Sequence, residues 1–219
     1  MAPQSRTHTQ LIEALAADLK PVRRPRSPYE YAAIWFAAVA ATALLFALLV
    51  DWSAVVARLM AHPDLWLAMA GAGLTAILGA VAAFQLSLPD RSPLWALLPL
   101  PGLALWLAFS GLGCLRSVAK SGLSDVLFGE LQVCLSFIVG MSLPLSVLVI
   151  LLLRQGYSLR PGLTGLSAGI AVAGASVALL NIIHPHDPTV IGIAVHIVAI
   201  LLVVFANRLA GGRIFAAAI

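Results

Sequence analysis

Six apolar runs, each about as long as a membrane-crossing helix, occupy most of the chain. A helix needs roughly 20 apolar residues to cross the hydrocarbon core of a bilayer. The predicted spans are residues 31–50, 65–88, 93–115, 131–153, 163–183 and 190–207. Because the connections between them are short, the predicted fold class is an all-α integral membrane protein, a single bundle of six transmembrane helices.

The composition agrees with a membrane location. The chain is 61% hydrophobic and 10% charged, against roughly 25% charged in ordinary soluble domains. The two-residue alternation of a membrane β-barrel is absent. The first apolar run follows about thirty mostly polar residues and has no small-residue cleavage site after it, so we interpret it as a retained span rather than a signal peptide.

The distribution of Lys and Arg predicts the orientation. If the N-terminus lies inside, ten basic residues are cytoplasmic: Arg6, Lys20, Arg23, Arg24, Arg26, Arg91, Arg154, Arg160, Arg208 and Arg213. Only Arg58, Arg116 and Lys120 then lie outside. This positive-inside bias predicts that both termini are cytoplasmic. The net charge of +4 then reflects topology and attraction to anionic lipid, and no direct binding of nucleic acid is predicted.

The chain therefore divides into three parts. Residues 1–29 form a cytoplasmic N-terminal segment, residues 30–209 the transmembrane domain, and residues 210–219 a cytoplasmic tail in which Gly211 and Gly212 predict a helix stop. Two outer loops, residues 51–62 and 118–127, carry apolar residues at helical spacing. This pattern is typical of short amphipathic helices lying on the membrane interface.

The N-terminal segment contains one further predicted helix, over residues 9–20. Leu11, Ile12, Leu15 and Leu19 share one face of it, and Pro21 ends the pattern. Isolated helices shorter than about 12–15 residues are marginal in water. The apolar face is therefore expected to bind either a partner protein or the membrane surface.

Small residues recur at four-residue spacing in two of the spans. Gly71, Thr75 and Gly79 do so in the second, and Gly165, Gly169 and Ala173 in the fifth. Such residues let helices in lipid approach closely. We interpret them as packing sites within one bundle, with a homodimer seam as the alternative.

Residues able to perform chemistry are scarce. No predicted span contains Lys, Arg, Asp or Glu at membrane depth, which argues against a coupled transporter, although a small transporter or channel is the alternative function. No metalloprotease, nucleophile-elbow or phosphate-loop motif occurs. We therefore predict that the protein is not an enzyme.

The polar candidates lie on the predicted outer side. Cys114 ends the third span, Cys134 begins the fourth, and His184, His186 and Asp187 lie in the loop after the fifth. The cysteines can form a disulfide in an oxidising periplasm, and Cys, His and Asp together can bind zinc or copper. The plainer interpretations are small apolar filler for the cysteines and a Pro-stiffened turn for the loop.

Several segments together resemble the NrsF-type membrane anti-sigma factors, which have six spans. They are residues 11–24 (LIEALAADLKPVRR), residues 84–92 (FQLSLPDRS), Gly113-Cys114, Cys134 and residues 160–165 (RPGLTG). Each motif is weak by itself, but their order and spacing cover essentially the whole chain.

The resemblance implies a multi-pass protein of the bacterial inner membrane that holds an extracytoplasmic-function sigma factor and releases it on an oxidant or metal cue. The implied partner-binding residues are Leu11, Ile12, Leu15, Asp18, Leu19, Arg23 and Arg24. The two arginines are expected to contact either acidic sigma-factor surface or lipid.

The resemblance also implies that outward-facing residues sense the cue, here Cys114, Cys134, His184 and His186. The family tends to carry a Cys next to Pro after the fifth span, where this chain has His184-Pro185-His186. Three alternatives follow: Cys114 pairs with Cys134, the His loop binds zinc or copper with the cysteines, or sensing has been lost.

Overall fold

The computed structural model describes residues 8–17, 26–121, 128–156, 158–183 and 190–216. Within these ranges the chain is helical and contains no β-strand. Its helices are α1 (His8–Ala17), α2 (Pro28–Ala47), α3 (Trp52–Ala61), α4 (Pro63–Leu86), the short 3₁₀ helix η1 (Pro93–Leu97), α5 (Leu100–Ser121), α6 (Phe128–Leu153), α7 (Pro161–Ile183) and α8 (Val190–Ala216). The predicted all-α fold is confirmed.

Six of the described helical segments are long and apolar enough to cross a membrane, as predicted. They are Pro28–Ala47, Pro63–Leu86, Pro93–Arg116, Gln132–Leu153, Pro161–Ile183 and Ile191–Ile214. Four of them begin at a proline, which suits the first helical position because it has no backbone N–H to leave unpaired. The spans at Pro28, Pro63 and Pro161 start two or three residues before the predicted boundaries, and the span at Pro93 starts where it was predicted.

The last span differs from the prediction at its end. The predicted helix stop at Gly211 and Gly212 is wrong, because α8 continues through both glycines to Ala216. Gly211 is buried, and Ile214 packs against the main hydrophobic core. This packing offsets the cost of about 1 kcal/mol for each glycine in a helix.

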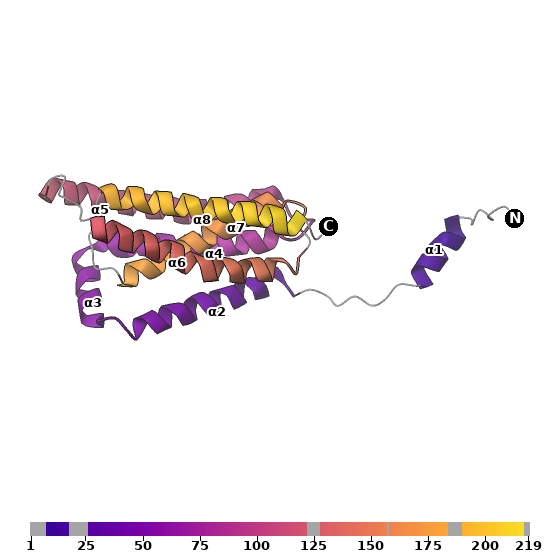
Figure 1. The fold of residues 1–219 in the computed structure, drawn as a ribbon, viewed down its shortest axis with the longest axis horizontal. Helices are drawn as coiled ribbons and strands as arrows, with labels where there is room; N and C mark the ends of the chain where they lie inside the picture. The colour runs from indigo at the N-terminus through magenta and orange to yellow at the C-terminus, as the bar shows by residue number, and fades with distance from the viewer. Residues whose placement is uncertain (1–7, 18–25, 122–127, 157, 184–189, 217–219) are drawn as a thin grey trace.

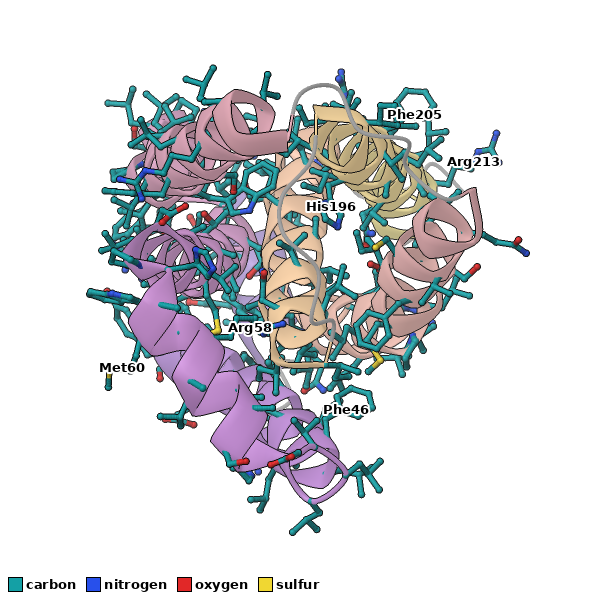
Figure 2. The ribbon with its side chains drawn as sticks, turned by 90° about the vertical axis from the view of Figure 1, so that its left-hand side faces the viewer. Phe46, Arg58, Met60, His196, Phe205 and Arg213 are labelled. Carbon is teal, nitrogen blue, oxygen red and sulfur yellow. The ribbon has the colours of Figure 1, made fainter. Side chains whose placement is uncertain are left out.

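Helices α4 and α7 form the centre of the bundle. They are the most buried spans, with 56% and 67% of their apolar windows buried, against 28% or less in the other four. Helix α5 packs on α4 and helix α8 on α7, while α2 packs against α4 and α7, and α6 against α7 and α8. The end-on view shows α7 in the middle of this arrangement (Figure 2).

The small residues form the closest contacts in this centre. Gly71 lies against the backbone of α5, and Gly79 against that of α7. Gly165 and Gly169 lie against the backbone of α8. Packing within one bundle is therefore confirmed, and these faces are already occupied inside the molecule rather than open to a second copy.

The two ends of the bundle differ in composition. We call the end where α2 begins and α8 finishes the basic end, and the opposite end, crossed by α3, the α3 end (Figure 1). Exposed arginines at the basic end are Arg26, Arg91, Arg154, Arg160, Arg208 and Arg213. The exposed arginines are therefore concentrated at one end of the bundle, and the side of the membrane that this end faces stays a prediction.

Helix α3 confirms the predicted short helix over residues 51–62. Asp51 caps it by accepting hydrogen bonds from the Ser53 hydroxyl and backbone, and these bonds hold the pKa of Asp51 below its usual range. Val55 is buried, and Met60 points outward (Figure 2). Arg58 donates a 2.6 Å hydrogen bond to the backbone carbonyl of Asn181, which joins α3 to the end of α7.

The second predicted interfacial segment, residues 118–127, is described only in part. Val118 belongs to α5, which continues to Ser121. Leu123, Val126 and Leu127 lie outside the described residues. A separate helix in this loop therefore stays a prediction.

Candidate functional site

Helix α1 presents an apolar face that no described part of the chain covers. None of its residues is buried, and the helix stands away from the bundle (Figure 1). Leu11, Ile12 and Leu15 are 45%, 65% and 63% exposed. These three residues, called the α1 stripe below, are arranged as the sequence predicts.

The remaining predicted partner-binding residues cannot be placed. Helix α1 ends at Ala17, and Asp18, Leu19, Arg23 and Arg24 lie outside the described residues. The described part of the predicted binding segment is therefore the α1 stripe.

The bundle begins at a well-defined anchor for α2. Ser27 caps the helix by accepting a hydrogen bond from the Glu30 backbone N–H. Tyr31 is 8% exposed, its ring stacks on Phe84 at 6.0 Å, and its hydroxyl donates a 2.8 Å hydrogen bond to Gln155 Oε1. The start of α2 is thereby tied to α4 and to the turn after α6.

Trp35 completes this anchor one turn further along α2. Its side chain is fully buried, and its Nε1–H donates a 3.3 Å hydrogen bond to the backbone carbonyl of Leu145 in α6. The buried residues of α2 are Tyr31, Ala32 and Trp35, all near its start. We call these three the α2 anchor. It fixes the start of α2, the span that carries α1, at the basic end of the bundle.

We expect Tyr31→Phe to loosen this anchor measurably. The substitution keeps the ring on Phe84 but removes the hydrogen bond to Gln155, which is worth about 1 kcal/mol. Amide hydrogen exchange over residues 32–36 should become about fivefold faster. Tyr29→Phe is the matched control, because Tyr29 is 59% exposed. Equal exchange rates in the two variants would show that the Tyr31 hydroxyl does not hold α2.

Two turns at the basic end are held together by hydrogen bonds between residues distant in sequence. The buried hydroxyls of Ser158 and Thr164 lie 3.2 and 3.1 Å from the Leu86 carbonyl and 2.7 Å from each other. The guanidinium of Arg160 donates to the Arg91 carbonyl at 3.0 Å. These hydrogen bonds therefore join the turn after α4 to the described residues between α6 and α7.

The α3 end contains the predicted sensing cysteines. Cys114 is buried and lines an open apolar groove with Gly111 and Ile193 between α5 and α8. Cys134 is half-buried and packs against the hydrophobic cluster that includes Ile138. The two cysteines are not joined by a disulfide in this structure.

The predicted metal ligands are only partly visible. His184 and His186 lie outside the described residues. Among the residues that the structure does describe, no group of three His, Cys, Asp or Glu side chains is placed to hold a metal ion. His196 lies on the inner side of α8 (Figure 2). The metal and redox sites therefore stay predictions.

An ion pair at the α3 end was not predicted from the sequence. Asp64, at the start of α4, accepts a 2.7 Å hydrogen bond from Arg116 near the end of α5. The Asp64 side chain is 8% exposed and that of Arg116 60% exposed. Fifty-two positions separate the pair, so local sequence patterns carry no signal for it.

Comparison with known protein families identifies the chain. The family described as NrsF, negative regulator of sigma F, matches residues 15–216. The chain belongs to the NrsF family. No curated protein and no solved structure matched it. Membership makes the protein a negative regulator of a sigma factor, and its six apolar helices make it a multi-pass membrane protein.

The NrsF match covers the whole bundle and only the last part of α1. Leu15 is inside the matched region, whereas Leu11 and Ile12 precede it. The resemblance drawn from residues 84–92, Cys134 and residues 160–165 is therefore confirmed at the level of the family.

Proposed function

We propose that this NrsF protein is an inner-membrane anti-sigma factor that binds an extracytoplasmic-function sigma factor through its cytoplasmic N-terminus. The observation that carries the proposal is the exposed α1 stripe in front of a membrane bundle. An amphipathic helix of ten residues is marginal alone and gains stability when its apolar face enters a groove of a partner.

The charge distribution supports a cytoplasmic position for α1. By the positive-inside rule, the arginines favour a cytoplasmic position for the basic end, and α2 begins there. A helix tethered to the start of α2 is then on the same side of the membrane as the transcription machinery. We propose that binding keeps the sigma factor away from RNA polymerase by holding it at the membrane.

We propose that release follows an envelope cue acting at the α3 end. An oxidant, or a thiol-binding metal such as zinc or copper, can modify or bind Cys114 and Cys134, with His184 and His186 as further ligands. A cue shifts the sigma-binding equilibrium only if it acts preferentially on one packing state of the bundle. The α2 anchor supports such coupling, because α2 connects α3 directly to the N-terminal segment.

The test is affinity purification of the tagged full-length protein from its own cells. We expect a sigma factor to co-purify with the wild type, and Leu15→Asp to reduce its recovery at least tenfold, because a carboxylate in an apolar groove must be desolvated. Gln10→Asp is the matched control, since it introduces the same charge on the opposite face of α1.

Two results would contradict the proposal. Recovery of no sigma factor with the wild type would argue against sequestration. Equal recovery with Leu15→Asp and Gln10→Asp would show that the α1 stripe is not the binding face. Flotation with vesicles of neutral and anionic lipid separates loss of partner binding from loss of membrane adsorption by α1.

A further inference from the structure

We propose that the basic end of the bundle forms a second part of the sigma-binding surface and takes an acidic patch of the bound partner. This inference rests on the proposed function and extends it from α1 to the membrane domain. The surface consists of Arg91, Arg154, Arg160, Arg208 and Arg213, all of which are exposed.

The small size of α1 leaves room for a second contact with the partner. A stable and specific protein interface involves about 20–30 residues on each side. Helix α1 has 10 residues, and its apolar stripe occupies one face. The basic end is the exposed surface to which the N-terminal segment is tied through the α2 anchor.

The charge at this end selects the kind of partner surface. Against its arginines, the described acidic residues there are Glu30 and Asp90. A guanidinium binds carboxylates through two parallel hydrogen bonds, which gives orientation as well as attraction. An acidic protein surface therefore fits this end.

The hydrogen bonds between the two turns favour a protein ligand over lipid headgroups. Arg91 and Arg160 lie on turns joined by the hydrogen bonds at Leu86, Ser158 and Thr164. Fluid headgroups need no fixed spacing between cations, whereas a folded surface binds more tightly to charges already held in place. The hydrogen bonds at Leu86, Ser158 and Thr164 fix the backbone that carries Arg91 relative to the backbone that carries Arg160.

The chain length allows one partner to reach both surfaces. Residues 18–27 separate α1 from α2, and ten residues span at most about 35 Å. A compact domain of 100 residues has a radius of gyration of about 13 Å. A sigma-factor domain on α1 is therefore held near the basic end at a high effective concentration.

The test measures the affinity of the sigma factor recovered above for the full-length protein in nanodiscs of phosphatidylcholine, which carry no net charge. We expect the double variant Arg91→Gln, Arg154→Gln, which keeps the hydrogen bond from Arg160 to the Arg91 carbonyl, to bind about tenfold more weakly, and the salt dependence of binding to become shallower. Asp90→Asn removes a negative charge from the same surface, so this variant should bind the sigma factor about twofold more tightly. Arg116→Gln removes a positive charge at the α3 end and should leave the affinity unchanged.

The outcomes separate this inference from the proposed function. If Leu15→Asp abolishes binding while the arginine and Asp90 variants keep wild-type affinity, the basic end is not part of the interface and α1 alone binds. If the arginine variants lose affinity only in nanodiscs with anionic lipid, the arginines act on headgroups and the inference is wrong. If the wild-type protein binds no sigma factor, both proposals fail.

Discussion

Gly169→Val should destabilise the bundle by about 3 kcal/mol, the upper part of the range for overpacked cores. A Cβ atom at Gly169 would lie 2.7 Å from the Cα of Val204 and 3.1 Å from the Cβ of Asn207. The nearest of these atoms belongs to the backbone of α8, so no side-chain rotation removes the clash. Helices α7 and α8 must therefore separate along one of the main contacts of the fold.

Valine is a better helix former than glycine, so the higher helix propensity of valine offsets about 0.5 kcal/mol of this destabilisation. The clash is expected to dominate, because it also disturbs the hydrogen bond from Asn207 to Ser146 that joins α8 to α6. The midpoint of thermal unfolding in detergent micelles measures the net effect.

Gly140→Val provides the matched control for this substitution. Gly140 lies within α6, and an added Cβ there would meet no atom within 4 Å. We expect its unfolding midpoint to equal or slightly exceed that of the wild type. A midpoint for Gly169→Val as high as that for Gly140→Val would show that α7 and α8 are not packed as closely as the structure has them.

The features that the sequence predicts correctly are those determined by neighbouring residues. Span length and hydrophobicity are local properties, and so is the spacing of the small residues such as Gly71 and Gly79. The α1 stripe also follows from helical spacing alone. The start of the spans at Pro28, Pro63 and Pro161 was predicted two or three residues too late, although its signal is local as well, because proline at the first helical position is a known preference.

The features that the sequence does not predict depend on contacts between distant residues. Tyr31 and Gln155 are 124 positions apart, and nothing near either residue indicates the other. Burial explains why α8 continues through Gly211 and Gly212 instead of stopping there, because Gly211 packs against the bundle. The α2 anchor and the hydrogen bonds between the turns of the basic end are therefore visible only in the three-dimensional structure.

Trp35→Ala is the second large effect that we expect, and it should act mainly on α2. Trp35 is the largest fully buried side chain described, and removal of such a side chain typically costs 3–5 kcal/mol. The alanine variant also loses the hydrogen bond to the Leu145 carbonyl and the edge contact with Phe36 at 5.3 Å. We expect a loss of about 3 kcal/mol, because lipid can partly refill the space.

The consequence should differ from that of Gly169→Val. The contacts of α4 with α5 and α7, and of α7 with α8, do not involve α2. Helix α2 should therefore detach locally while these helices stay packed. Hydrogen exchange over residues 28–47 should rise far more than exchange over residues 63–86 and 161–183, the central helices α4 and α7. Uniform acceleration across all three segments would contradict a local role for the anchor.

Two further variants separate packing from hydrogen bonding at this position. Trp35→Phe keeps an aromatic ring but removes the Nε1–H donor, so its effect should be intermediate. Trp66→Ala removes a tryptophan that is 47% exposed on α4 and should change exchange little. If the proposed function is correct, Trp35→Ala should also reduce sigma-factor retention, because the start of α2, which carries α1, is then no longer fixed at the basic end. Retention equal to that of Trp66→Ala would show that α1 binds its partner independently of the bundle.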